Sequence, residues 1–410
     1  MIETLFTQAL GLAVPWEVVD VKFSPEQHRI DFHVVCQAGA DHACPACGAG
    51  GTAVHDWNER SWRHLDFFQY EAYLHAEVPR VKCPHCGKVS QVEVPWARPG
   101  SRFTLLFEAL VVGLAPLMSV AGLARQMRVG DDPLWRILNH HVKAARALES
   151  HAGIEAIGVD ETAAKRGQRY ISVFFDLGSD RLLFATEGRS KETFKHFVKD
   201  FADHGGVPNE IRRVSMDMSA SFQAGVAEQL PEATVCFDRF HVVALASEAL
   251  DEVRRVEQKS APELKGSRWA LLKKPLDWTV KQLNAMYTLQ RSNLKTARAW
   301  RLKEALREIY RTATSPEDAE PLLARWRSWA SRCRLEPFKK LARTLKTHWE
   351  GVLNGFNEGC HNGKVEAMNR SLQEARARAR GYRRTENFIN MAYLIAGKLT
   401  HLPKSPFAKA

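Results

Sequence analysis

The chain has no uninterrupted apolar run of the length that spans a membrane. Its longest apolar stretch, residues 103–124, contains Glu108 and Pro116, and the spacing of its apolar residues favours two short helices of a soluble core. A secretory leader is not visible either, because Glu3 stands where a signal peptide has basic residues. The sequence therefore predicts a cytoplasmic protein with no membrane partner.

Cysteines that could form disulfides are scarce. Of the eight cysteines in 410 residues, four form two Cys-x-x-Cys pairs, Cys44 with Cys47 and Cys83 with Cys86. This arrangement is typical of metal binding in a reducing compartment. Each Cys-Pro-x-Cys-Gly segment is expected to turn tightly and present two thiolates, so we predict one structural Zn²⁺ held by all four. Three other residues compete as ligands, although ordinary packing or exposure is the simpler interpretation for them: Cys36, His42 and His85.

Acidic residues are too few to balance the basic ones. The chain has 47 Asp and Glu against 58 Lys and Arg, which gives a formal net charge of +11. Such an excess indicates a polyanionic partner, and nucleic acid is the first candidate. The length of the chain predicts two to four domains.

Residues 99–150 have a helical pattern throughout. Two short helices are expected at residues 103–114 and 120–128, and Asp131-Asp132-Pro133 opens a third with an acidic cap and an early proline. A short helix, a brief turn and a basic helix are typical of a helix-turn-helix domain, although plain three-helix bundles share the pattern. The candidate DNA contacts on the third helix are Arg136, Asn139, Lys143 and Arg146.

Residues 151–245 have the element order of the ribonuclease H fold, namely three strands, a helix, a strand, a helix and a strand. In that fold the first strand lies in the middle of a mixed five-stranded sheet and the fourth lies beside it. Asp160 ends the first expected strand and Asp217 ends the fourth, so the two should be neighbours. Close carboxylates repel unless cations lie between them, and oxygen ligands suit Mg²⁺ or Mn²⁺. Taken singly, each aspartate is more simply a strand-end residue that faces water.

A charged helical region, residues 246–350, interrupts this core. Aromatic side chains among cations can stack on unpaired bases, but we favour the interpretation that most of its tryptophans form the core of an inserted helical domain. These tryptophans are Trp269, Trp278, Trp300, Trp326, Trp329 and Trp349.

Residues 351–410 return to the core with a helix that Asn362 is expected to cap. Glu366 shares one face of this helix with Asn369 and Gln373, and in the ribonuclease H fold the helix packs against the sheet edge that bears the two aspartates. Basic residues along the helix are placed to contact DNA phosphates. They are Lys364, Arg370, Arg376, Arg378 and Arg380.

These segments predict a multidomain α/β protein with five regions. A zinc-binding β module covers residues 1–98 and a helix-turn-helix domain residues 99–150. The ribonuclease H-like core takes residues 151–245 and 351–410, on either side of the helical insertion at residues 246–350.

Four motifs make the sequence similar to DDE transposases of the ISL-three family of bacterial insertion sequences. They are Gly158-Val-Asp160-Glu-Thr162, Val214-Ser-Met-Asp217-Met-Ser219, Phe237-Asp-Arg-Phe-His241 and Asn362-Gly-Lys-Val-Glu366-Ala-Met-Asn369. The family shares the zinc finger and the helix-turn-helix, so the resemblance spans nearly the whole chain. Two small departures touch no expected metal ligand: Thr162, where the family more often has an aromatic residue, and Ala367, where glycine is common.

The resemblance implies an enzyme that binds the terminal inverted repeats of an insertion sequence, cuts at the element ends and joins them to target DNA. Asp160 would bridge two Mg²⁺ or Mn²⁺ ions in this phosphoryl transfer, and Asp217 and Glu366 would each complete one. Arg239 and His241 are secondary active-site candidates, and Asp238 is the main rival of Asp217. Because an element has two ends, a homodimer on double-stranded DNA is the natural expectation.

Two other functions fit parts of the pattern. A sequence-specific DNA-binding regulator could keep a non-catalytic ribonuclease H-like scaffold for dimerisation, but the presence of all three carboxylates argues against it. A host nuclease such as a junction resolvase could share the core. The zinc and helix-turn-helix segments, which suit the reading of sequence, disfavour that interpretation.

Overall fold

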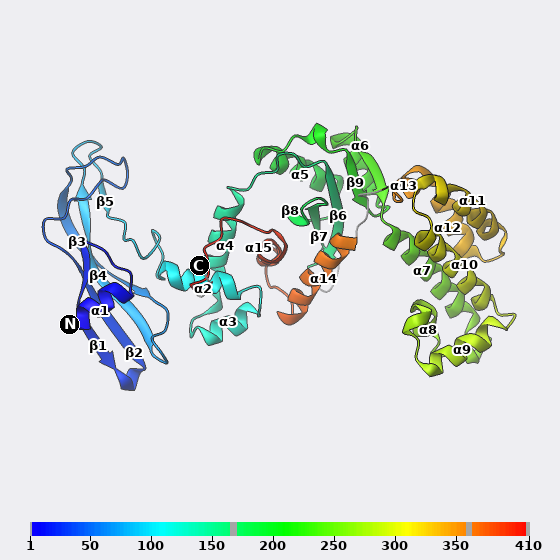
Figure 1. Ribbon diagram of the computed structural model, residues 1–410, viewed down its shortest axis with the longest axis horizontal. Helices are drawn as coiled ribbons and strands as arrows, with labels where there is room; N and C mark the ends of the chain where they lie inside the picture. Colours follow the sequence, from blue (N-terminus) through cyan, green and yellow to red (C-terminus); the bar gives the residue numbers. More distant parts are fainter. Residues whose placement is uncertain (1, 165–169, 358–362, 407–410) are drawn as a thin grey trace. The chain divides into compact units, whose positions relative to one another are not determined.

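The computed structural model describes residues 2–164, 170–357 and 363–406 (Figure 1). The chain forms two compact units, residues 1–144 with 401–410 and residues 145–400. Within the described segments, no helix has the length and apolar character needed to cross a membrane. The boundaries of the five predicted regions stay a prediction.

The first unit contains a five-stranded sheet in the order β1-β2-β4-β3, with β5 paired to β4. Alternate residues of β2 and β4, among them Phe32 and Leu74, point into one buried core. Trp16 and Trp62 both pack edge to face against Trp96 in this core. The elements are α1 (Ile2–Ala9), β1 (Trp16–Ser24), β2 (Arg29–Cys36), β3 (Ala53–Arg63), β4 (Glu71–Lys82) and β5 (Val89–Gln91).

Three helices follow in the helix-turn-helix order that the sequence predicts: α2 (Leu105–Leu114), α3 (Val120–Gln126) and α4 (Asp131–Arg146). The charge in the apolar stretch, Glu108, is fully buried, and its carboxylate accepts hydrogen bonds from Arg98 at 2.8 Å and Ser101 at 2.6 Å and contacts His141 at 2.7 Å. Burial alone would raise the pKa of Glu108, but these partners outweigh it and lower the pKa. Glu108 therefore holds α2, α4 and the preceding loop together.

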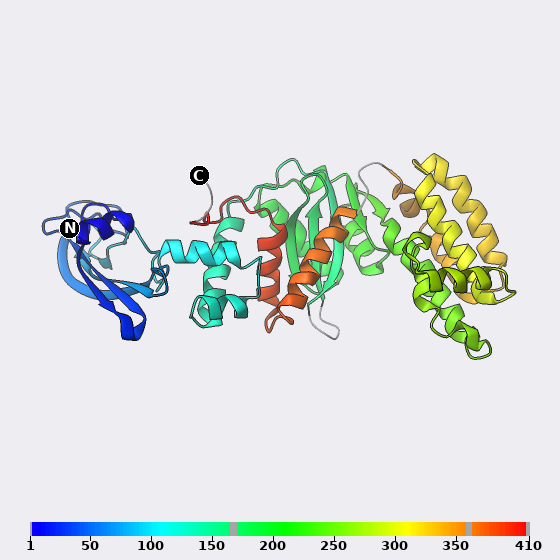
Figure 2. The ribbon, with the colours of Figure 1, turned by 60° about the horizontal axis from the view of Figure 1, so that its bottom comes forward.

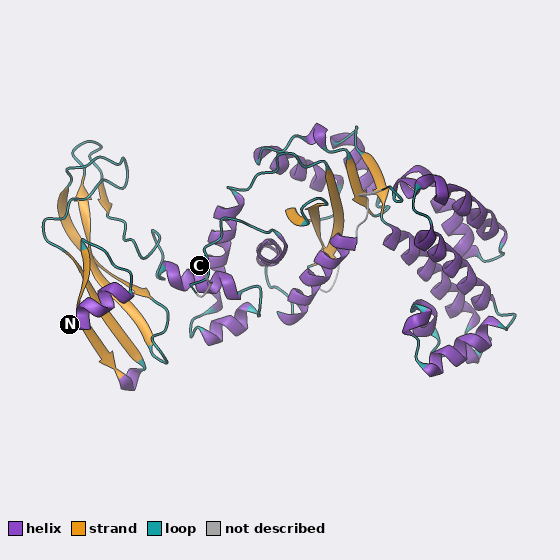
Figure 3. Cartoon of the chain, viewed as in Figure 1, coloured by secondary structure: helices purple, strands orange, loops and turns teal. Residues whose placement is uncertain are grey.

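The second unit has the ribonuclease H-like core, whose sheet order is β10-β9-β6-β7-β8. The predicted order is confirmed, because the first strand of the core, β6, lies in the middle with the fourth strand, β9, parallel beside it. Figure 3 shows this sheet among its helices. The strands are β6 (Ala156–Ala163), β7 (Tyr170–Asp176), β8 (Arg181–Glu187), β9 (Arg213–Met216) and β10 (Thr234–Phe237).

Helices cover both faces of the sheet. Ile157 and Val159 of β6 are buried in one cluster with Phe194 and Phe197 of α5. The alternate residues of β6 face the opposite way, and there α14 packs against β6 and α15 against β8 (Figure 2). The helices are α5 (Lys191–Asp203), α6 (Ala220–Gln229), α14 (Gly363–Arg378) and α15 (Thr385–Ala396). The predicted cap of α14, Asn362, lies outside the described residues.

A run of helices, α7 to α13, follows β10 and includes the predicted insertion at residues 246–350. Trp326 is 3% exposed and donates its indole N–H to the Leu302 carbonyl at 2.8 Å, and Trp278, Trp300 and Trp349 pack against the same core. The core interpretation of these four is therefore confirmed, whereas Trp269 and Trp329 are exposed. The helices are α7 (Arg239–Glu257), α8 (Arg268–Leu272), α9 (Val280–Gln290), α10 (Lys295–Thr312), α11 (Pro316–Arg332), α12 (Glu336–Thr347) and α13 (Trp349–Asn354).

The aromatic layer between the sheet and α5 yields a stability prediction. Phe174 lies face to face on Phe197, with ring centroids 4.3 Å apart, and both side chains are fully buried. We expect Phe174→Ala to lower the free energy of unfolding by about 3–5 kcal/mol, measured by urea denaturation of the full chain. Phe68→Ala, at a residue 82% exposed, is the control and should change it by less than about 0.5 kcal/mol. Equal effects of the two changes would contradict this assignment of the core.

Candidate active site and zinc site

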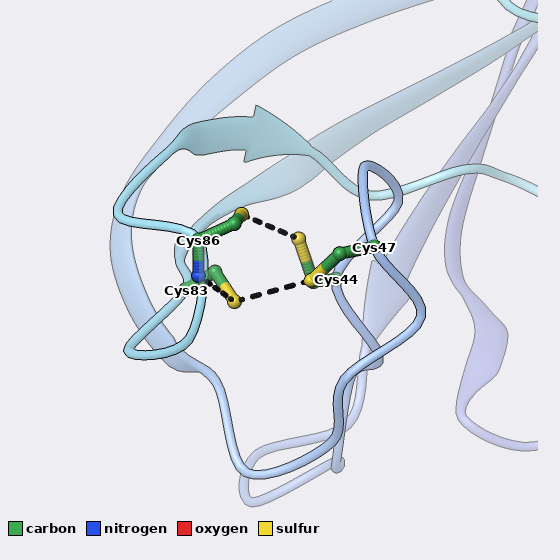
Figure 4. Close-up of side chains that lie close together, drawn as sticks. All are labelled: Cys44, Cys47, Cys83 and Cys86. Carbon is green, nitrogen blue, oxygen red and sulfur yellow. Dashed lines mark hydrogen bonds between the residues drawn. The ribbon is translucent and has the colours of Figure 1, made fainter.

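The four predicted cysteines come together in the first unit (Figure 4). The sulfur atoms of Cys44 and Cys86 are 3.8 Å apart, and those of Cys47 and Cys83 are 3.6 Å apart. A tetrahedral ion with Zn–S distances of about 2.3 Å requires sulfur–sulfur distances of about 3.8 Å, so the ligand set fits zinc without rearrangement.

Each pair of cysteines lies on a tight turn. Gly48 donates its N–H to the Cys44 carbonyl at 2.8 Å, and Gly87 does the same to Cys83 at 3.0 Å. Both glycines have a positive φ, 75° and 70°, which explains their place in the motif. The competing residues stay out of the cluster: Cys36 and His42 contact each other at 3.7 Å, and His85 is exposed.

This geometry predicts one zinc ion per chain. We expect Cys47→Ser to abolish stoichiometric zinc binding, measured by metal analysis of the purified chain, and to lower the melting temperature of the first unit, because a structural site contributes folding free energy. Cys333→Ser, at a cysteine outside the cluster, is the matched control. Full zinc content in Cys47→Ser would exclude Cys47 as a ligand.

The two aspartates of the predicted active site lie at one edge of the second sheet. In the parallel pairing of β6 with β9, Gly158 is opposite Ser215. Asp160 and Asp217 each lie two residues further along, so they share a register position and a direction from their strands. Glu366 lies in the first turn of α14, which packs against β6. The prediction that Asp160 ends its strand is wrong, because β6 continues to Ala163 and Asp160 lies inside it, opposite Val173 of β7. The topology therefore places all three carboxylates around the second half of β6.

The carboxylates interact electrostatically. Asp160 has a side chain only 17% exposed; burial raises its pKa, and the charge of Asp217 raises it further. Burial also raises the pKa of Glu366, to which Asp238 and Asp160 contribute as like charges. Among the described residues, however, the three are not a group whose ligand atoms all lie within 4.8 Å of one another. The three carboxylates therefore interact through their like charges without all being close enough to share one ion as they stand.

The secondary candidates belong to the same cluster. Asp238 is 2% exposed and caps α7 by accepting the Phe240 N–H at 3.2 Å. The Nε2 atom of His241 lies 3.8 Å from a carboxylate oxygen of Asp238 and 3.9 Å from one of Asp160. The charge of Arg239 lowers the pKa of Glu366 and thus opposes the carboxylates that raise it. Asp238 is therefore part of the carboxylate cluster and stays the main rival of Asp217.

Sequence reasoning left Asn369 and Gln373 out of the site. Asn369 donates its amide N–H to Asp160, and Gln373 donates to the Thr162 hydroxyl. Arg376 continues the row by donating to the Ala163 carbonyl at 2.9 Å. The signal was present, because these residues share the helix face of Glu366 at spacings of three and four. What it could not show was that their partners are on β6.

A further acid, Glu161, follows Asp160 directly. Burial raises its pKa, and the charge of Asp217 raises it next. Arg189 lies 3.9 Å away and opposes this effect. Glu161 thus adds to the negative potential that surrounds Asp217.

The predicted DNA-binding residues fall into three groups. Arg136, Lys143, Arg370, Arg378 and Arg380 are exposed, and Asn139 is half-buried. The side chain of Lys364 lies outside the described part of the chain. Arg146 is engaged within the second unit: its guanidinium bonds Asp200 at 2.8 Å and the Leu183 carbonyl at 3.1 Å and lies over the Tyr393 ring. We therefore remove Arg146 from the set that we propose to contact DNA.

A second group of potential metal ligands, His151, Asp200 and His204, lies elsewhere in this unit. The Asp200 carboxylate already holds Arg146, and the ring nitrogens of His204 face two backbone carbonyls at 2.7 and 3.0 Å. A divalent cation would have to displace these contacts next to a guanidinium. We interpret this group as structural.

Comparison with known proteins gives the class first. A family model described as a transposase matches residues 157–392, which include all three carboxylates. A zinc finger of IS204, IS1001, IS1096 and IS1165 transposases matches residues 40–86, and a helix-turn-helix domain of ISL3 transposases matches residues 92–142. The chain is a transposase by class. It belongs to the ISL3 family of DDE transposases.

Two relatives found by sequence agree with this assignment. The chain is 31% identical to a transposase for insertion sequence element IS1557 from Mycobacterium tuberculosis, over 97% of both chains. It is 26% identical to a transposase for IS1001 from Bordetella parapertussis, over 84% of this chain and 86% of the other. Among solved structures, the Drosophila P element transposase strand transfer complex aligns with 73% of this chain and 93% of its own at a TM-score of 0.40 and 10% identity.

The contact between Asn369 and Asp160 yields a prediction on cation binding. The Asn369 N–H lowers the pKa of Asp160, so Asn369→Leu should raise that pKa and weaken divalent cation binding by roughly 10-fold, the equivalent of one charge-assisted hydrogen bond. Calorimetric titration with Mn²⁺ measures the affinity of the wild type and of the variant. Gln373→Met is the matched control, because Gln373 bonds Thr162 on the same face and should leave the affinity unchanged. Unchanged affinity in Asn369→Leu would show that the contact does not shape the site.

Proposed function

We propose that this ISL3 transposase cleaves DNA at the ends of its insertion sequence and joins the freed ends to target DNA at the cluster of Asp160, Asp217 and Glu366. One observation carries the proposal. Two aspartates share a register position on parallel strands, with a glutamate helix packed against the same strand, in a chain of a DDE transposase family.

Asp160, Asp217 and Glu366 would hold two divalent cations. The fit of the residues rests on charge and ligand type. They offer oxygen atoms, as Mg²⁺ and Mn²⁺ prefer, and burial together with like charge raises the pKa values of Asp160 and Glu366. A positive ion relieves this repulsion. When bound, such ions activate a water or a 3′-hydroxyl as nucleophile and stabilise the leaving oxygen of the phosphodiester.

The side chains around the cluster would position the reacting groups. Asn369 fixes the orientation of the Asp160 carboxylate, and His241 lies between Asp160 and Asp238, where its ring restricts both. Arg239, whose charge acts on Glu366, and Arg370, one turn further along α14, would contact the phosphate that is attacked. Positioning of this kind, with fixed charges, accounts for much of the rate enhancement in phosphoryl transfer.

DNA would be held at two places on the chain. Arg136, Asn139 and Lys143 of α4 would read the terminal inverted repeat in the major groove. Arg376 and Arg380 line a hollow of about 730 Å³, together with Tyr382 and Arg383, which suits a phosphate backbone. Arg378 adds a further exposed cation near the end of α14, and a homodimer would pair the two ends of the element.

The triad is tested by single substitutions. We expect Asp160→Ala, Asp217→Ala and Glu366→Ala each to lower Mg²⁺-dependent strand cleavage by at least about 1,000-fold, because each removes a metal ligand, while the affinity for end DNA stays within about twofold. Gel assays of cleavage and binding on the same labelled end duplex measure both. Asp203→Ala, at an exposed aspartate of α5, is the control.

Asp238→Asn separates the two interpretations of the second aspartate. If Asp217→Ala retains cleavage and Asp238→Asn abolishes it, then Asp238 replaces Asp217 as the metal ligand. If the wild-type chain binds end DNA and never cleaves it, then the chain is a DNA-binding regulator and the proposed activity is wrong.

A further inference from the structure

We propose that Phe240 and the hollow beside it bind one unpaired nucleotide of the DNA that flanks the cleaved phosphodiester. This inference rests on the proposed function and adds a nucleotide subsite to it. The subsite lies on α7, at the end where Asp238 and His241 belong to the carboxylate cluster.

Phe240 is a large apolar side chain that the core does not use. It lies in the first turn of α7, between Arg239 and His241, and is 55% exposed. Its ring meets the edge of the His241 ring with centroids 5.8 Å apart. The Nε2 atom of His241 lies 3.9 Å from a carboxylate oxygen of Asp160. Phe240, the residue before His241, therefore exposes an aromatic surface next to the site where a phosphodiester would be attacked.

A hollow of about 670 Å³ begins at Phe240 and follows one face of α7 toward α8 and α10. Near Phe240 its wall is apolar, with Val243 and Ala244 on the next turn of α7. Hollows of roughly 300–1,000 Å³ hold ligands of the size of a nucleotide. The space is therefore sufficient for a base that has left its helix, together with its sugar.

The rest of the lining supplies charge for the nucleotide backbone. Five basic residues line the hollow against three acidic ones. One of the acidic residues, Asp251, is paired with Arg254 at 2.7 Å, Arg255 at 3.4 Å and Arg268 at 3.7 Å, so its charge holds guanidinium groups in place. Lys274 also lines this wall. The guanidinium groups at Asp251 lie eleven residues, or about 16 Å, along α7 from Phe240. They would therefore contact phosphates of neighbouring nucleotides, while Phe240 contacts the base.

Stacking on an aromatic ring is the interaction that an unpaired base offers, because every base has a π face. A wedge of this kind also unstacks the base step that it enters and bends the duplex. Phe240 would thus hold the flanking nucleotide out of the helix and give the carboxylates access to the phosphodiester next to it. Phe240 is a positioning residue in this proposal, since it touches the base and not the reacting atoms.

The test compares Phe240→Ala with wild type on end duplexes that are intact or carry one abasic nucleotide at each position flanking the cut. Because stacking contributes about 1–3 kcal/mol per base, Phe240→Ala should cleave intact DNA about 10-fold to 100-fold more slowly and bind it within about twofold of wild type. One abasic substrate should restore its rate to within about threefold, since no base then needs to be displaced. Phe240→Trp should keep the wild-type rate, and Trp329→Ala, at an exposed tryptophan of α11, is the matched control.

A second measurement does not require cleavage. With 2-aminopurine at the same flanking position and Ca²⁺ as the only divalent ion, wild type should raise the fluorescence on binding, as expected for a base that leaves the stack, and Phe240→Ala should not. The inference is overturned if Phe240→Ala cleaves intact DNA at the wild-type rate, if no abasic substrate rescues it, or if the fluorescence rises equally in both. A wild-type chain that unstacks 2-aminopurine but cleaves nothing would support the subsite and refute the proposed activity.

Discussion

Repulsion among partly buried carboxylates is the constraint on which the polar centre of the second unit depends. Asp160 is largely buried and shares its electrostatic neighbourhood with Asp217, Glu161, Glu366 and Asp238. Folding alone would disfavour such a group, because burial and like charge both penalise ionised carboxylates. Partial compensation comes from the Asn369 amide, the Glu161 N–H at 2.7 Å and the His241 ring. A cation would neutralise the remaining excess of negative charge, which is the role that we propose for the divalent ions.

The strands of the ribonuclease H-like core could be predicted from sequence periodicity, because each strand has its own alternation of apolar and polar residues. Ile157 and Val159 face α5, while Gly158 and Asp160 face α14, and this alternation is visible in the sequence. The order of the strands then placed Asp160 beside Asp217. The starts of helices also depend on neighbouring residues: Thr104 and Ser119 cap α2 and α3 by accepting N–H groups from three residues ahead.

Contacts between residues far apart in the chain could not be predicted from local patterns. The zinc module and the helix-turn-helix fold as one unit, through His64 with Thr104 at 2.9 Å and Arg128 with Glu71 at 3.3 Å. The residues around Arg128 in the sequence do not predict its pairing with Glu71, and those around Arg146 do not predict its pairing with Asp200. The same holds for the active site, where Asn369 and Glu366 were visible on one helix face, but their distances from Asp160 depend on how α14 packs.

The helical insertion is joined to the sheet at the strand that ends beside the cluster, which explains how an insertion could take part in the chemistry. Its first helix, α7, begins at Arg239, and the residue that caps it, Asp238, is also one of the carboxylates of the cluster. Its last helix, α13, returns to β10: Asn354 donates to the Val235 carbonyl at 3.1 Å, and a Cβ at Gly355 would lie 2.4 Å from the Phe237 carbonyl oxygen. Only glycine permits that approach. Because both ends of the insertion are fixed to the same short strand, the face of α7 that bears Phe240 is held in place relative to the carboxylates.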